Sequence, residues 1–98
     1  MSSNVYIPGN ETFVLGDISN KSYKADLTNT SFRTVTLKIV ETKTQQVRQE
    51  VELGSKESIT LQIQGDETVY IINNQSGRVR IKASLSKGIE GMRYIPTE

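Results

Sequence analysis

The sequence lacks three residue types on which many active sites depend: its 98 residues include no cysteine, no histidine and no tryptophan. Without cysteine and histidine, the chain can form no disulfide, and it offers no thiolate nucleophile, no imidazole acid or base and no usual set of zinc ligands. It also has no glycine-rich phosphate loop and no calcium-loop spacing. We therefore expect a protein that is not an enzyme and that holds neither a cofactor nor a metal ion.

Long apolar runs and a dominant sign of charge are also absent. No stretch reaches the ~20 apolar residues of a membrane span, and the first residues lack the basic region of a signal peptide, so we expect an intracellular protein if Met1 is the native start. Twelve basic and eleven acidic residues give a net charge of +1. A nearly neutral chain creates no field that would recruit nucleic acid, and no nucleic-acid partner is expected.

What the sequence does contain is a repeated alternation of apolar and polar residues, which places one face of a β-strand on a core and the other in water. Turn-forming clusters rich in Gly, Asn, Asp and Ser separate these segments. The pattern predicts one domain over residues 1–98, an all-β antiparallel sandwich of about 7–8 short strands, immunoglobulin-like or jelly-roll-like. A helix within residues 40–51 is a weaker alternative. The alternating apolar residues are Val35, Leu37, Ile39, Val51, Leu53, Ile59, Leu61, Ile63, Val79, Ile81, Ala83 and Leu85.

The register that joins apolar faces predicts a meander in which each strand pairs with the next, since a slip of one residue would turn a strand over. The expected partners are Leu37 with Val51, Lys38 with Glu50, Val51 with Leu61, Leu61 with Tyr70, Ile59 with Ile72, Ile72 with Val79, and Tyr70 with Ile81. Tyr70 and Ile72 would then face the core. Val69 and Ile71 would lie on the outer face, which makes this strand apolar on both sides.

A basic stripe accompanies these two outer residues in the predicted pairing. Arg78, Arg80 and Lys82 share one strand face beside Val69 and Ile71, and together the five form the candidate contact surface. An anionic partner could dock there through charge and central apolar contact. The alternative is a solvated edge strand, on which charge discourages edge-to-edge aggregation.

Two further patterns have both a functional and a structural interpretation. The four tyrosines could form a platform for stacking sugars, although the best stacking side chain, tryptophan, is missing. Four of the six asparagines begin an Asn-x-Ser/Thr triplet, which is either a glycan acceptor or a consequence of the preference of these residues for turns. The residues concerned are Tyr6, Tyr23, Tyr70, Tyr94, Asn10, Asn20, Asn29 and Asn74.

These observations together predict a non-catalytic interaction or structural module, whose partner is another protein or a second copy of the chain. Self-association would use the outer face of the C-terminal hairpin, because small domains gain stability from burying surface that one chain cannot cover. A small carbohydrate-binding module and a component of a surface or virion assembly are the alternatives.

Overall fold

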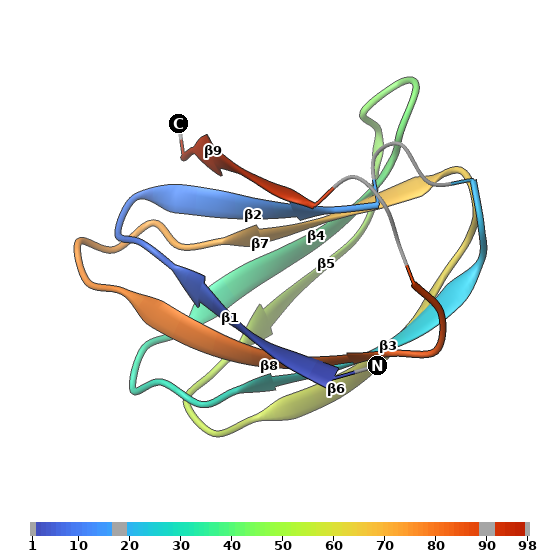
Figure 1. Cartoon of the computed structure of the whole chain (residues 1–98). Coiled ribbons are helices and arrows are strands. Elements are labelled where there is room, and N and C mark those ends of the chain that lie inside the picture. Colours follow the sequence, from blue (N-terminus) through green and yellow to red (C-terminus); the bar gives the residue numbers. More distant parts are fainter. Residues whose placement is uncertain (1, 17–19, 89–91, 98) are drawn as a thin grey trace.

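The computed structural model describes residues 2–16, 20–88 and 92–97, which form nine strands in two packed antiparallel sheets (Figure 1). Within these residues there is no helix with the length and hydrophobicity needed to cross a membrane. Sheet A has the strand order β1 (Ser2–Ile7), β8 (Val79–Leu85), β3 (Tyr23–Asn29), β6 (Ser58–Ile63). Sheet B has the order β5 (Val47–Leu53), β4 (Val35–Glu41), β7 (Glu67–Ile72), β2 (Glu11–Leu15), β9 (Arg93–Pro96).

The pairing of the first eight strands follows one rule. β4 pairs with β5, β3 with β6, β2 with β7 and β1 with β8, as in a long hairpin doubled over at the β4–β5 turn. Rolling this ribbon adds the β3–β8 and β4–β7 contacts and separates the pairs alternately into two sheets. This is the jelly-roll arrangement, with β9 added beside β2 in sheet B.

Every second residue along the strands points inward, and these side chains form the core between the two sheets. Alternation is clearest in β3 and β8, where buried and exposed positions follow each other along the strand. The hydrophobic core consists of the buried residues Ile7, Phe13, Leu15, Tyr23, Ala25, Leu27, Val35, Leu37, Ile39, Leu53, Leu61, Ile63, Val69, Ile71, Val79, Ile81, Ala83 and Leu85.

The predicted strands and the first hairpin are confirmed. Leu37 lies opposite Val51, and Lys38 lies opposite Glu50 with 3.9 Å between the ammonium and the carboxylate. The helix considered within residues 40–51 is wrong, because β4 and β5 meet there through a turn in which Gln45 has a φ of 60°.

The rest of the predicted meander is wrong, because consecutive strands cross between the sheets. β6 lies in sheet A beside β3 and does not pair with β5, so Val51 has no partner in Leu61. β7 pairs with β4 and β2. Tyr70 and Ile72 accordingly pair with none of the β6 and β8 residues that were predicted as their partners.

The two faces of β7 are the reverse of the prediction. Val69 and Ile71 are 0% and 1% exposed and belong to the core, whereas Tyr70 and Ile72 lie on the half-buried outer face of sheet B. β7 is the middle strand of five. When a central strand has apolar residues on both faces, its sequence pattern alone does not determine which face points to the core.

Candidate functional site

The three basic residues of the predicted contact surface lie together on the outer face of sheet A. Arg78 directly precedes β8, and Arg80 and Lys82 occupy outward positions within it, all exposed. Because β8 is held between β1 and β3, the charged edge strand considered above is wrong. Val69 and Ile71 are not part of this surface, since they face the core from the other sheet.

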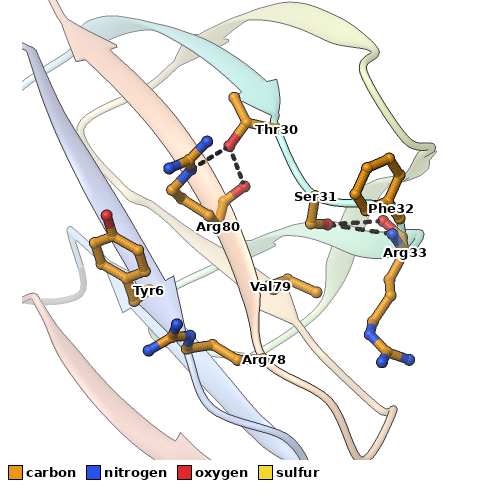
Figure 2. Close-up of a pocket in the computed structure, with 8 residues that line it drawn as sticks. All are labelled: Tyr6, Thr30, Ser31, Phe32, Arg33, Arg78, Val79 and Arg80. Carbon is orange, nitrogen blue, oxygen red and sulfur yellow. Dashed lines mark hydrogen bonds between the residues drawn. The ribbon is translucent and has the colours of Figure 1, made fainter.

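Beside Arg78 and Arg80 of this basic stripe, the surface has a shallow depression of about 620 Å³. The strand pair β1–β8 forms its floor, and the loop between β3 and β4 forms its wall (Figure 2). We call it the arginine hollow; its lining is Tyr6, Thr30, Ser31, Phe32, Arg33, Arg78, Val79 and Arg80.

Aromatic rings and cations pair at two places in this region. The guanidinium of Arg78 lies 5.3 Å from the ring centroid of Tyr6, and the ammonium of Lys56 lies 4.7 Å from that of Phe32. Phe32 is 88% exposed and Tyr6 is 44% exposed, so each pair presents apolar area and positive charge to solvent together. Such pairs are worth about 0.5–1 kcal/mol at exposed sites.

The arginines on either side of the hollow are positioned by neutral groups. The Nε of Arg80 donates a hydrogen bond of 2.8 Å to the hydroxyl of Thr30, and this hydroxyl donates a 3.1 Å hydrogen bond to the Arg80 carbonyl (Figure 2). Arg33 donates a 3.4 Å hydrogen bond to the Oε1 of Gln75. Its guanidinium also lies over Gly77, where an added Cβ would clash with the Cζ of Arg33.

The loop that carries Phe32 is fixed by one buried side chain, Asn29, at the end of β3. Its Nδ2 donates to the carbonyls of Arg33 and Leu53, and its Oδ1 accepts from the N–H and the hydroxyl of Ser31. Asn29 is 0% exposed, which supports the turn-forming interpretation of this triplet because the amide is inaccessible to a glycosylating enzyme in the folded state. The exposed Phe32 therefore projects from an ordered loop.

The arginines of the hollow have no acidic partner among the residues that the structure describes. Within the described part of the chain, no carboxylate lies within ion-pair distance of Arg33, Arg78 or Arg80. Asp26, an acidic residue on the outer face of sheet A, accepts a hydrogen bond from the hydroxyl of Thr60 in the edge strand β6. The hollow thus combines several donors with a net positive potential.

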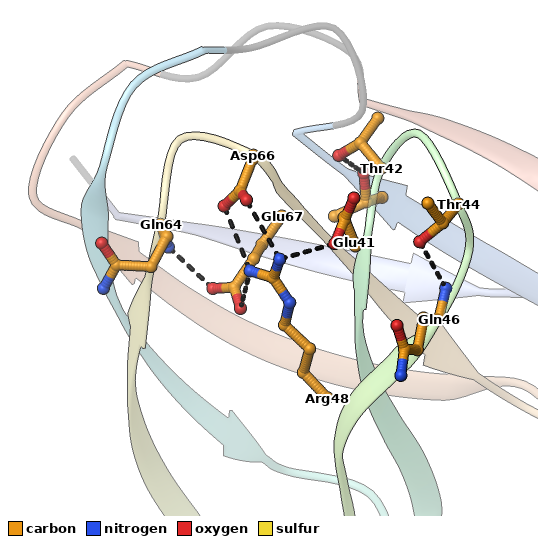
Figure 3. Close-up of polar contacts among 9 residues, drawn as sticks. Glu41, Thr42, Thr44, Gln46, Arg48, Gln64, Asp66 and Glu67 are labelled. Carbon is orange, nitrogen blue, oxygen red and sulfur yellow. Dashed lines mark hydrogen bonds and ion pairs between the residues drawn. The ribbon is translucent and has the colours of Figure 1, made fainter.

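A second charged cluster, at the opposite end of the sandwich, pairs one arginine with three carboxylates. Arg48 of β5 bonds the carboxylates of Glu41, Asp66 and Glu67 at 2.7–3.2 Å and ties the β6–β7 turn to the β4–β5 pair (Figure 3). Its hydrogen bonds hold the pKa of Asp66 below the usual value, and they raise the pKa of Arg48 itself. Among the described residues, no group of three or more His, Cys, Asp or Glu side chains is placed to hold a metal ion, and this cluster has the role of a structural clamp.

The tyrosine platform considered from the sequence is not assembled. Tyr23 is buried, and burial raises the pKa of its hydroxyl above the usual value. Tyr6 lies on sheet A, Tyr70 lies on the outer face of sheet B with its hydroxyl 2.7 Å from Gln45, and Tyr94 of β9 packs on Phe13. The four rings are therefore spread over the core and different surfaces.

The sequence did not place six of the eight lining residues in this site, and Tyr6 was considered only for the tyrosine platform; the six are Tyr6, Thr30, Ser31, Phe32, Arg33 and Val79. The only signal was a Phe between Ser31 and Arg33 in a turn segment, where an apolar side chain has no core to enter. No protein-family model matches the sequence, and no curated protein matches it. The assignment of the site consequently depends on its geometry.

Proposed function

We propose that this protein is a non-catalytic interaction module that binds an acidic segment of a partner protein in the arginine hollow. The observation that carries the proposal is the juxtaposition of unneutralised arginines with the exposed rings of Phe32 and Tyr6 on an ordered frame. Arginine and aromatic residues are enriched among the residues that dominate binding energy at protein interfaces.

The chemistry of the hollow favours carboxylates in an extended peptide. Arginine presents a planar fork of donors that matches a carboxylate, while the neighbouring ring offers apolar contact to the side chains between the acids. The depression is shallow and open on one side, which suits a peptide more than an enclosed small molecule. Since Asn29 and Thr30 already order the loop and Arg80, binding costs little additional conformational entropy.

The test uses a synthetic peptide of alternating Glu and Tyr, titrated into the 15N-labelled protein. We expect amide shifts confined to β1, β8 and the loop at residues 30–33, and weaker binding at high salt. Arg78→Glu combined with Arg80→Glu should weaken binding by at least tenfold. The matched control is Lys24→Glu combined with Lys87→Glu, which makes the same total change of charge at two exposed positions outside the hollow.

Two outcomes would contradict the proposal: no binding by the wild-type protein, or an equal loss in the control and in the arginine variants. The second result would show that general charge, and not the hollow, attracts the peptide. The other interpretations of the sequence gain no particular support. Jelly rolls serve in capsids and lectins alike, so the fold does not select between an assembly component and a carbohydrate-binding module.

A further inference from the structure

The four sheet edges differ in how they are protected against pairing with another strand. β5 carries Arg48, Glu50 and Glu52 and has a register shift against β4, and β9 is short and includes Arg93 and Pro96. β1 is followed by Pro8 and lies beside the basic stripe of β8. β6, with the sequence SITLQI, has no charged residue and no proline. Natural proteins usually use charged residues or proline to protect an exposed edge strand against further pairing, and β6 has neither.

The backbone of β6 presents a row of groups to solvent. At the end of β3, Asn29 exchanges backbone hydrogen bonds with residues 56 and 57, so its N–H and C=O point toward β6. Because bonding direction alternates along an antiparallel pair, Ile59, Leu61 and Ile63 direct their backbone groups to β3. The groups of Thr60 and Gln62 then point outward, and both residues are exposed.

The side chains along this margin are also incompletely covered. Ile59 of β6 faces the core and is only partly buried, and Val51 of β5, which pairs with the buried Leu37, is partly exposed as well. These two residues mark the side of the sandwich where β5 and β6 are the outermost strands (Figure 1). A strand added to β6 would extend the sheet and cover part of this apolar margin.

We propose that a second copy of this chain pairs with β6, antiparallel and about a two-fold axis at Leu61, to join two copies of sheet A into one continuous eight-stranded sheet. Thr60 would then exchange backbone hydrogen bonds with the second copy's Gln62, and Gln62 with the second copy's Thr60. A two-fold axis sets a strand against itself, so any charge on the strand would meet a like charge close by. The neutral side chains of Ser58, Thr60 and Gln62 avoid that penalty.

This interaction is independent of the arginine hollow. β6 and β1 lie at opposite edges of sheet A, with β8 and β3 between them. Pairing through β6 therefore leaves both hollows open and displays two of them on one extended sheet.

The experiment measures the mass of the full chain by light scattering on a sizing column over a dilution series, with amide hydrogen exchange on the same samples. We expect the mass to rise toward twice 11.0 kDa with concentration. In the concentrated sample the amides of Thr60 and Gln62 should exchange at least tenfold more slowly than in the dilute sample. Gln62→Pro removes an outward N–H at an edge position where proline is tolerated, and should give a monomer. The matched variant Gln62→Thr retains the N–H and should dimerise.

A monomer at every concentration would overturn the proposal. So would a dimer in which the Thr60 and Gln62 amides exchange as fast as those of an open edge, because that dimer would use another surface. If Gln62→Pro does not fold, the exchange rates of the wild-type protein still decide the question. A folded Gln62→Pro variant that dimerises as well as the wild type would also refute it.

Discussion

Replacing Ile71 and its neighbour Ile72 by threonine, one at a time, tests which face of β7 packs into the core. Ile71 is 1% exposed, and its register partners are Phe13 and Leu37, whose side chains offer no hydrogen-bond acceptor. Ile71→Thr removes two carbons, worth about 0.8 kcal/mol each, and buries a hydroxyl without a partner at about 1–3 kcal/mol. We therefore expect a loss of about 3–4 kcal/mol in the free energy of unfolding.

Ile72→Thr makes the same chemical change on the outer face of sheet B, where the residue is only partly buried. Its hydroxyl can reach water, so the expected cost is below about 1 kcal/mol. Urea denaturation followed by circular dichroism measures both. With an m-value of about 1–2 kcal/mol/M, the midpoint should fall by about 1.5–4 M for Ile71→Thr and by less than about 1 M for Ile72→Thr. If Ile72→Thr is the more destabilising variant, the strand is turned the other way and the core described above is incorrect.

Two further predictions concern the polar clamps at either end of the sandwich. Arg48→Gln should destabilise the protein at neutral pH, and in urea melts its difference in stability from the wild type should shrink as the pH falls below about 3.8. The reason is that the lowered pKa of Asp66 gives stability that is present above that value and is lost as the carboxylate is protonated. A difference in stability that stays constant with pH would contradict this. Asn29→Asp replaces a buried donor to two carbonyls by an acceptor and should cost about 2–4 kcal/mol, whereas Asn20→Asp at an exposed position should be neutral in the same denaturation assay.

The strands could be predicted from the sequence, but most of their partners could not. Alternation identifies which residues of a strand share a face, and a short turn with complementary Lys38 and Glu50 was enough to predict the β4–β5 pair. The turn at Gly65 and Asp66 looks like a hairpin turn, yet it joins β6 of sheet A to β7 of sheet B. A short turn can serve either purpose, and local sequence does not distinguish them.

The remaining pairs connect strands that are increasingly distant along the chain, ending with Val5 opposite Ile81 in β1 and β8. Their pairing follows from how the doubled ribbon rolls to bury its apolar faces, which is a property of the whole chain. β7 illustrates the consequence, because both of its faces are apolar and only the neighbours of the folded sheet decide that Ile71 points inward and Ile72 outward.

The sequence predicted the residues of the candidate site that lie on a single strand, β8. It did not predict the residues that only the strand order brings to the site. Arg78, Arg80 and Lys82 share a face because they alternate, whatever β8 pairs with. Tyr6 joins them only because β1, the first strand, pairs with β8, which places Tyr6 opposite Arg80.

The loop residues of the hollow depend on topology in the same way. In this jelly roll the loops after β1, β3, β5 and β7 all lie at one end, since these four strands run toward it. Lys56 therefore meets Phe32, and Arg33 meets Gln75, although each pair is separated by more than twenty positions in the sequence. A site of this kind is built by the convergence of loops. The cations on β8 can be found by pattern, but Arg33 and the aromatic residues that make the hollow a binding surface become visible only when the strand order is known.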